Sequence, residues 1–110
     1  MYSKELLKGT LQTIVLRLLS ENGRMYGYEM TQRVRELSEG KIVLTEGSLY
    51  PTLHKLEAAG VLQTEKVKVG NRTRKYYSLT PQGEEQAVAK VSELAEFFRT
   101  MRLLLSLKNT

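Results

Sequence analysis

Several residue types are missing from this 110-residue sequence, which contains no cysteine, no tryptophan and no aspartate. Without cysteine the chain can form no disulfide, no thiolate nucleophile and no cysteine-ligated zinc site. The single histidine, His54, cannot make a multi-histidine metal site, and a catalytic triad that needs aspartate is excluded as well. Composition therefore argues against an enzyme, and we expect no catalytic residues, no metal and no cofactor.

Long apolar runs are missing too, since no window approaches the roughly 18 apolar residues that a membrane span requires. The apolar stretch near the start is interrupted by Lys8, Thr10, Gln12 and Thr13, and it lacks a small-residue cleavage site, so it does not resemble a secretory signal. We therefore expect a cytoplasmic protein with no membrane partner. The length suits one domain with one modest core.

The positive charge is concentrated in one short segment. Residues 1–61 carry eight basic residues against seven glutamates, and residues 80–110 carry four of each, so both segments are nearly neutral. Residues 62–79 carry five basic residues against Glu65 alone. Such a basic patch indicates a polyanionic partner, although a solvated, lysine-rich edge strand that discourages aggregation would show the same pattern.

Hydrophobic periodicity predicts three helices in the first half of the chain. Apolar residues recur at steps of three and four within residues 4–20, 27–38 and 46–59. Each segment is followed within three residues by a glycine, which commonly ends a helix. The short β-branched run of residues 41–44 suits a brief strand between the second and third helices.

A β-hairpin is predicted next, and it decides the expected fold. Residues 62–69 and 72–79 flank Gly70-Asn71, a pair that provides the positive φ of a tight turn. Three helices followed by a two-stranded hairpin is the element order of a winged helix, a variant of the helix-turn-helix. We therefore predict a mainly α protein with a small β-hairpin, of the α+β class.

The last helix is predicted to be too long for its own domain. It begins at Thr80-Pro81, a favourable cap and first residue, and continues to about Leu107. At 1.5 Å per residue it spans about 40 Å, against the ~26 Å diameter expected of a domain this size. It could fold over its own core as a single helix, but we favour a partner helix from a second copy of the chain. Its apolar seam has heptad spacing and contains Ala87, Val91, Leu94, Phe98, Met101 and Leu105.

The third helix has two contrasting faces. Leu49, Leu53 and Leu56 share one face and should anchor the helix on the core. The other face is polar and nearly free of carboxylates until Glu57, so it can enter a major groove without repelling phosphate. Its predicted DNA contacts are Ser48, Tyr50, Pro51, His54 and Lys55. The predicted contacts of the hairpin with the DNA backbone or minor groove are Lys66, Lys68, Asn71, Arg72, Arg74 and Lys75.

Four groups of residues match the motifs of one known family. They are Leu11-Gln12 with Val15-Leu16; Tyr26-Gly27-Tyr28-Glu29; Gly47-Ser48-Leu49-Tyr50-Pro51 with Leu53, Leu56-Glu57 and Gly60; and Arg74-Lys75-Tyr76-Tyr77 with Leu79-Thr80 and Gly83. With these motifs, residues 5–85 resemble the PadR family of transcriptional regulators. The resemblance implies a winged helix-turn-helix DNA-binding domain at residues 1–80 and a C-terminal dimerisation helix at residues 81–110, as in the short subfamily.

The resemblance also implies a homodimer built by the N-terminal and C-terminal helices. The predicted interface residues are Leu7, Leu11, Val91, Leu94, Phe98, Met101 and Leu105. Some short members of the family bind flat aromatic drugs between the subunits through a tryptophan, and this chain has Leu94 near that position. A small hydrophobic or aromatic effector is therefore a candidate partner. Its pocket residues would be Leu94, Phe97, Phe98 and Met101, although such a cluster also suits a plain interface core.

The histidine and several tyrosines each allow two interpretations. His54 can donate to a base or act as a pH switch, but we favour an ordinary half-exposed helix residue. Tyr26 and Tyr28 can touch phosphates or pack between helices, and packing is favoured for Tyr28. Because Tyr76 and Tyr77 lie on opposite faces of one strand, only Tyr77 is expected in the core, and Tyr76 can contact DNA or a neighbouring element.

Together these patterns predict a sequence-specific transcriptional regulator. We expect a homodimeric repressor that binds a pseudo-palindromic site in double-stranded DNA, with a small hydrophobic effector as a candidate for releasing it. The alternative is a winged-helix module that docks another protein. The acid-poor helix face beside a basic hairpin favours nucleic acid.

Overall fold

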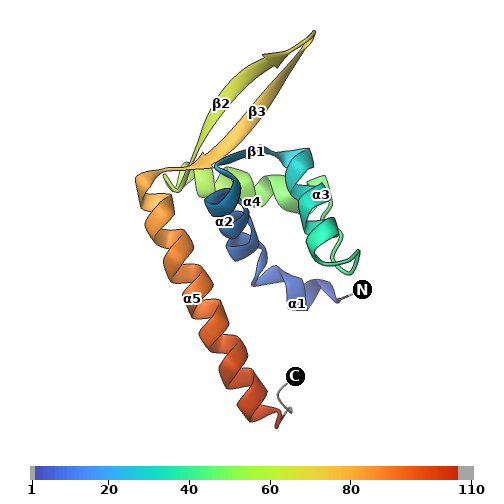
Figure 1. Ribbon diagram of the computed structural model, residues 1–110, viewed down its shortest axis with the longest axis vertical. Coiled ribbons are helices and arrows are strands. Elements are labelled where there is room, and N and C mark those ends of the chain that lie inside the picture. Colours follow the sequence, from blue (N-terminus) through green and yellow to red (C-terminus); the bar gives the residue numbers. More distant parts are fainter. Residues whose placement is uncertain (1, 107–110) are drawn as a thin grey trace.

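Five helices and three strands make up residues 2–106, the part of the chain that the computed structural model describes (Figure 1). In chain order they are α1 (Lys4–Lys8), α2 (Leu11–Asn22), β1 (Arg24–Tyr26), α3 (Gly27–Leu37), α4 (Glu46–Ala58), β2 (Leu62–Val69), β3 (Arg72–Leu79) and α5 (Pro81–Leu104). The strands form one antiparallel sheet in the order β1-β3-β2, and α2, α3 and α4 pack against its strands. This arrangement confirms the predicted α+β class.

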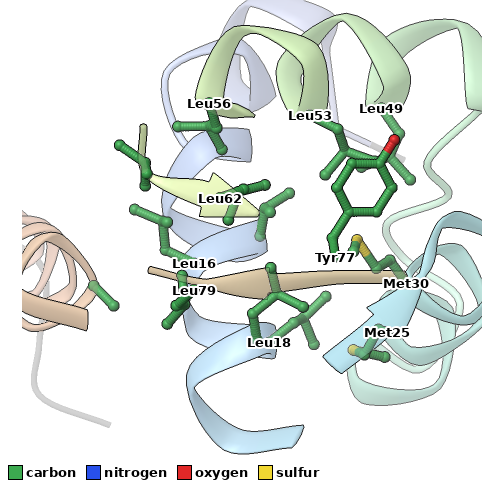
Figure 2. Packing of buried hydrophobic residues seen from close by; sticks show 14 of the residues in the cluster. Leu16, Leu18, Met25, Met30, Leu49, Leu53, Leu56, Leu62, Tyr77 and Leu79 are labelled. Atoms are coloured by element: carbon green, nitrogen blue, oxygen red, sulfur yellow. The ribbon is translucent and has the colours of Figure 1, made fainter. Parts of the chain in front are cut away.

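The hydrophobic core lies between these helices and the sheet. Leu49, Leu53 and Leu56 of α4 are all buried, as their spacing predicted, and Figure 2 shows them on the side of α4 that faces β2 and β3. Tyr77 of β3 is only 1% exposed, which confirms that this tyrosine, and not Tyr76, faces the core. The core therefore fixes α4 with one face inward and leaves the other face outward.

The predicted first helix, residues 4–20, is two helices in the structure. The carbonyl oxygen of Leu7 accepts hydrogen bonds from both the N–H of Thr10, at 3.0 Å, and the hydroxyl of Thr10, at 2.9 Å. These bonds end α1, and Gly9, a poor helix former, lies between α1 and α2. A hydrophobic stripe that continues on both sides of such a break hides it from periodicity.

The strand predicted at residues 41–44 is wrong, because this segment is a loop. Leu44 is buried and Ile42 packs against the core, so the apolar run serves burial and not strand pairing. The hydroxyl oxygen of Ser38 accepts a hydrogen bond from the N–H of Ile42 at 2.9 Å and holds the loop at the end of α3. The third strand is instead β1, whose three residues pair with β3 and are too few to show periodicity.

Helix α5 is attached to the rest of the chain by its first turns. The hydroxyl oxygen of Thr80 caps it by accepting a hydrogen bond from the N–H of Gly83 at 3.0 Å. Gly83 lies so close to the hairpin that an added Cβ would be 2.1 Å from the carbonyl oxygen of Val61. Beyond this point α5 packs along α2 and then extends past the other helices (Figure 1).

Helix α5 ends at Leu104, slightly before its predicted end, and Leu107 lies outside the described residues. Ser106 has a φ of 55°, the left-handed conformation that commonly follows the end of a helix. The 24 residues of α5 correspond to about 36 Å at 1.5 Å per residue. The longest extent of the molecule, 54 Å, exceeds its other two extents of 29 and 21 Å.

Candidate nucleic-acid interface

Helix α4 presents most of its predicted DNA-contacting residues to solvent. The hydroxyl oxygen of Thr45 accepts a hydrogen bond from the N–H of Ser48 at 3.2 Å and so caps the helix. The three leucines are buried on one side of α4, so its opposite side faces outward. Four of the five predicted residues are exposed: Ser48, Pro51, His54 and Lys55.

Tyr50, the fifth predicted residue, lies at the edge of this face and is half-buried. Its hydroxyl and ring lie against α3, so close to Gly27 that an added Cβ there would be 2.5 Å from the hydroxyl oxygen. This confirms that Gly27 permits a close contact between helices. Burial raises the pKa of Tyr50 above its ordinary value, and the Glu46 carboxylate adds to the effect.

The basic hairpin extends beyond the helices as a two-stranded wing (Figure 1). Its strands pair along their full length from Leu62 opposite Leu79 to Val69 opposite Arg72, which confirms the predicted boundaries. Gly70 has a φ of 63° at the turn, the conformation for which a glycine was expected. The predicted contact residues that are exposed along the wing are Lys66, Lys68, Asn71 and Arg72.

Lys75 has contacts within the chain that sequence reasoning did not foresee. Its Nζ lies 3.4 Å from Oε1 of Glu57 on α4 and 5.4 Å from the ring centroid of Tyr77. The other carboxylate oxygen of Glu57 accepts a hydrogen bond from the Thr64 hydroxyl at 3.3 Å. Partial burial lowers the pKa of Lys75, but the Tyr77 hydroxyl and Glu57 together raise it above its ordinary value. Glu57 thus joins α4 to both strands of the wing.

Two arginines and two tyrosines stack across β1 and β3. The rings of Tyr26 and Tyr76 meet edge to face with centroids 5.4 Å apart, so Tyr76 packs on a neighbouring element. The guanidinium of Arg74 lies 4.4 Å from the centroid of Tyr26, and that of Arg24 lies 4.5 Å from the centroid of Tyr76. Arg24 also forms an ion pair with the Glu65 carboxylate at 2.7 Å, whereas Arg74 pairs with no carboxylate within residues 2–106.

Tyr28 does not pack between helices, and that prediction is wrong. The side chain is 56% exposed on the first turn of α3. The physical reason is the helical period, because Tyr28 precedes the buried Met30 by two residues and so lies about 200° around the helix from it. The spacing of the buried residues in α3 could have revealed this exposure.

A cavity of about 370 Å³ opens between the start of α3, the edge of α4 and β3. Its lining residues come from β1, α3, α4 and β3, which are far apart in the sequence. No carboxylate lines it within the described part of the chain. Its lining consists of Tyr26, Gly27, Tyr28, Tyr50, His54, Thr73, Arg74, Lys75 and Tyr77.

A second, apolar groove of about 390 Å³ lies between α2, α3 and α5. Of the four predicted effector-pocket residues, Leu94 and Phe98 line it, whereas Phe97 and Met101 do not. Phe97 lies beside Phe98, with ring centroids 6.5 Å apart. The predicted dimer-interface residues divide by exposure: Leu7, Leu11, Val91, Leu94 and Met101 are half-buried, and Phe98 and Leu105 are exposed.

Comparison with known families identifies the fold that carries these features. The model of the transcriptional regulator PadR-like family matches residues 15–89, which include α3, α4 and the whole wing. The chain belongs to the PadR-like family of transcriptional regulators. PadR-family proteins are regulators that bind double-stranded DNA and usually dimerise, and they are not enzymes.

Individual relatives agree with this assignment. A protein named transcriptional regulator Rv3488 from Mycobacterium tuberculosis is 33% identical over 96 residues, which cover 87% of this chain and 86% of that protein. A transcriptional regulator from Clostridium thermocellum has a similar structure, with a TM-score of 0.81, 27% identity and coverage of 99% of this chain and 100% of its own. A PadR-family regulator from Eggerthella lenta has a TM-score of 0.77 and 30% identity over 94% of this chain and 88% of its own.

From the family match, the relatives and the winged architecture, we conclude that this chain is a transcriptional regulator of the PadR family. The predicted family and fold class are thereby confirmed. As for a membrane, no helix within residues 2–106 combines the length and the apolar character that a span would need.

Proposed function

We propose that this PadR-family regulator is a homodimeric repressor that binds a pseudo-palindromic operator. The observation that carries the proposal is the exposed outer face of α4, with the basic wing beside it. In this proposal residues 1–80 form the DNA-binding domain, and residues 81–110 provide the dimerisation helix. The two α4 helices would enter successive major grooves about 34–36 Å apart.

Base reading is assigned to α4, and backbone contact to the wing. Ser48, His54 and Lys55 offer side chains that can bond to base edges or phosphates, while Pro51 limits how close the helix approaches. If the two wings neutralise about six phosphates, the logarithm of the binding constant should fall with the logarithm of salt concentration at a slope near −5. The proposed wing contacts are Lys66, Lys68, Asn71, Arg72, Arg74 and, through its position beside α4, Lys75.

The exposed apolar surface of α5 supports a second copy as the dimerising partner. Phe98 is 54% exposed in the second half of α5, and Leu105, at the end of the helix, is 60% exposed. Such large apolar side chains commonly mark an interaction surface. A homodimer is the simplest assembly, because it brings two identical apolar stripes together and creates a two-fold axis that matches a palindromic site.

A small hydrophobic effector is proposed to act from the groove between α2, α3 and α5. Leu94 and Phe98 line this groove and belong to the helix that would join the two protomers. A bound ligand can change DNA affinity only if it prefers one separation of the two α4 helices over another. Release of the operator would then follow from a small rotation of one α5 against its partner.

The decisive experiment is selection of bound duplexes from a random DNA pool at about 0.15 M salt. Enrichment of an inverted repeat whose half-sites are about one helical turn apart is the expected result. The matched control is a wing variant with Arg72→Glu and Arg74→Glu, which should bind heparin and duplex DNA much more weakly. Full retention of both by the variant would contradict nucleic-acid binding and favour a winged helix that docks a protein.

A further inference from the structure

We propose that the cavity between α3, α4 and β3 binds one backbone phosphate of the DNA, held by Tyr28, Tyr50 and Arg74. This inference rests on the proposed DNA-binding function and adds a site to it. Neither of the two tyrosines lies at the tip of the wing or on the central outer face of α4. Each protomer would therefore hold the DNA at a third place, between its recognition helix and its wing.

The position of the cavity favours the DNA backbone over a base. Its walls come from the edge of α4 beside the exposed face and from the part of β3 where the wing leaves the helices. If α4 lies in a major groove and the wing contacts the flanking backbone, a phosphate of the strand between them lies against this opening. His54 lines the cavity and is also exposed on the outer face of α4, so the cavity and that face adjoin at this residue.

The chemistry of the lining suits an anion that only accepts hydrogen bonds. No carboxylate lines the cavity within the described residues, and Arg74 is not paired with a carboxylate anywhere in residues 2–106. Its guanidinium stacks on Tyr26 at 4.4 Å, which holds the plane in place and leaves its N–H edges to donate. Lys75 adds positive charge, but Glu57 already partners it.

Two tyrosines, Tyr28 and Tyr50, belong to the lining of the cavity. Within residues 2–106 neither Tyr28 nor Tyr50 donates its hydroxyl to a protein acceptor, although both line the cavity. The Tyr50 hydroxyl packs closely against Gly27, and burial raises its pKa above the ordinary value. Two tyrosines and one arginine therefore line a single space of about 370 Å³, where their hydroxyl and guanidinium donors can serve a phosphate.

The structure provides a matched control for this site. Arg24 and Arg74 each stack on a tyrosine of the same pair at nearly equal distances, 4.5 and 4.4 Å, but Arg24 lies outside the cavity. Arg24→Gln and Arg74→Gln remove the same charge and the same kind of stacking contact. Comparison of the two variants thus separates a phosphate contact from a general loss of charge or of sheet packing.

The test measures binding of the selected operator by fluorescence anisotropy over a range of salt concentrations. We expect Arg74→Gln to weaken binding about 10-fold, equally for operator and scrambled duplexes, and to make the salt slope shallower by about 0.9 for each phosphate lost. Arg24→Gln should change affinity less than about 2-fold. Tyr28→Phe, which keeps the ring and removes only an exposed hydroxyl, should weaken binding about 3-fold without changing the slope.

A phosphate-by-phosphate scan then locates the contact. Duplexes with one neutral methylphosphonate should reveal a position in each half-site where the substitution weakens binding of the wild-type protein but not of Arg74→Gln. Absence of such a position, or equal effects of Arg24→Gln and Arg74→Gln, would overturn the inference while leaving DNA binding intact. A loss confined to one base pair would assign Arg74 to a base and overturn it as well.

Two further outcomes separate the inference from its premise and from a free ligand. If the wild-type protein binds no duplex, the proposed function fails, and the phosphate site fails with it. Inorganic phosphate at constant ionic strength and without DNA should leave the unfolding temperature unchanged. A saturable stabilisation that Arg74→Gln abolishes would identify a free phosphate ester as the ligand and overturn the assignment to the DNA backbone.

Discussion

Helices α4 and α5 carry similar apolar stripes, but the two stripes differ in how much of them the chain buries. In α4 the three leucines at helical spacing are all buried in the core of their own chain. In α5 the stripe begins with the buried Ala87 but continues to side chains as exposed as Phe98 and Leu105. Periodicity therefore predicts an apolar face, whereas the surrounding fold decides whether the same chain covers it.

The largest effect should come from α4. Leu53→Ala removes a fully buried side chain, so we expect the free energy of unfolding to fall by about 2–5 kcal/mol. Denaturant unfolding followed by circular dichroism measures this loss. Leu105→Ala, at the end of the α5 stripe, is the matched control, because its exposed side chain should contribute little to the stability of a protomer. Equal losses in the two variants would contradict the difference between the stripes.

The exposed half of α5 should matter for assembly and not for folding of the protomer. Phe98→Glu places a charge in the proposed dimer interface, and we expect the dimer dissociation constant to rise at least about 30-fold, as at a hot spot worth about 2 kcal/mol. Sedimentation equilibrium measures the constant. Ser92→Glu, exposed on another side of α5, is the control and should leave it nearly unchanged. A wild-type protein that stays monomeric would disprove the proposed dimer.

The anchored end of α5 can be tested at Gly83. Gly83→Ala would bring a Cβ within 2.1 Å of the Val61 carbonyl oxygen, so the start of the helix must shift away from the hairpin. We expect a loss of about 1–3 kcal/mol, the usual cost of overpacking. Thermal unfolding checks the value, and Gly9→Ala, with no atom within 4 Å of the added Cβ, is the control. A Gly83→Ala variant as stable as Gly9→Ala would contradict the tight contact.

The edge of α4 should give the smallest effect, seen only at high pH. The pKa of Tyr50 is raised in the folded state, so its stabilising contribution is complete below the ordinary tyrosine pKa of about 10 and is lost as pH rises through the folded value. Free energies of unfolding measured between pH 8 and 11 should therefore decline more steeply in the wild type than in Tyr50→Phe. Parallel curves would show that burial does not perturb this hydroxyl.

Much of the fold could be predicted because its signals are local. The boundaries of the hairpin follow from Gly70-Asn71 and the alternation around it, and the orientation of α4 follows from the leucine spacing. The loop at residues 41–44 and the strand β1 were missed for a common reason. Pairing partners of a short strand lie about 50 residues away in sequence, as for Arg24 and Ser78, so no local pattern encodes them.

The candidate site was predicted in part, for the same reason. Exposure of Ser48, His54 and Lys55 follows from the side of the helix opposite the leucines. By contrast, no local sequence pattern around Lys75 predicts its ion pair with Glu57, which lies 18 residues earlier. Nor does a charge count distinguish Arg74, which faces a cavity, from Arg24, which pairs with Glu65.

By itself the sequence determined the classes of chemistry that are absent, the helical faces, the hairpin and the family motifs. These depend on residue types and on spacings within one or two turns of backbone, where geometry is nearly constant. Tertiary packing alone sets which apolar stripe is covered, which cations are already paired and which cavity Tyr28, Tyr50 and Arg74 line together. Such outcomes depend on contacts between distant segments, and these exist only once the core has set the angles between helices and sheet.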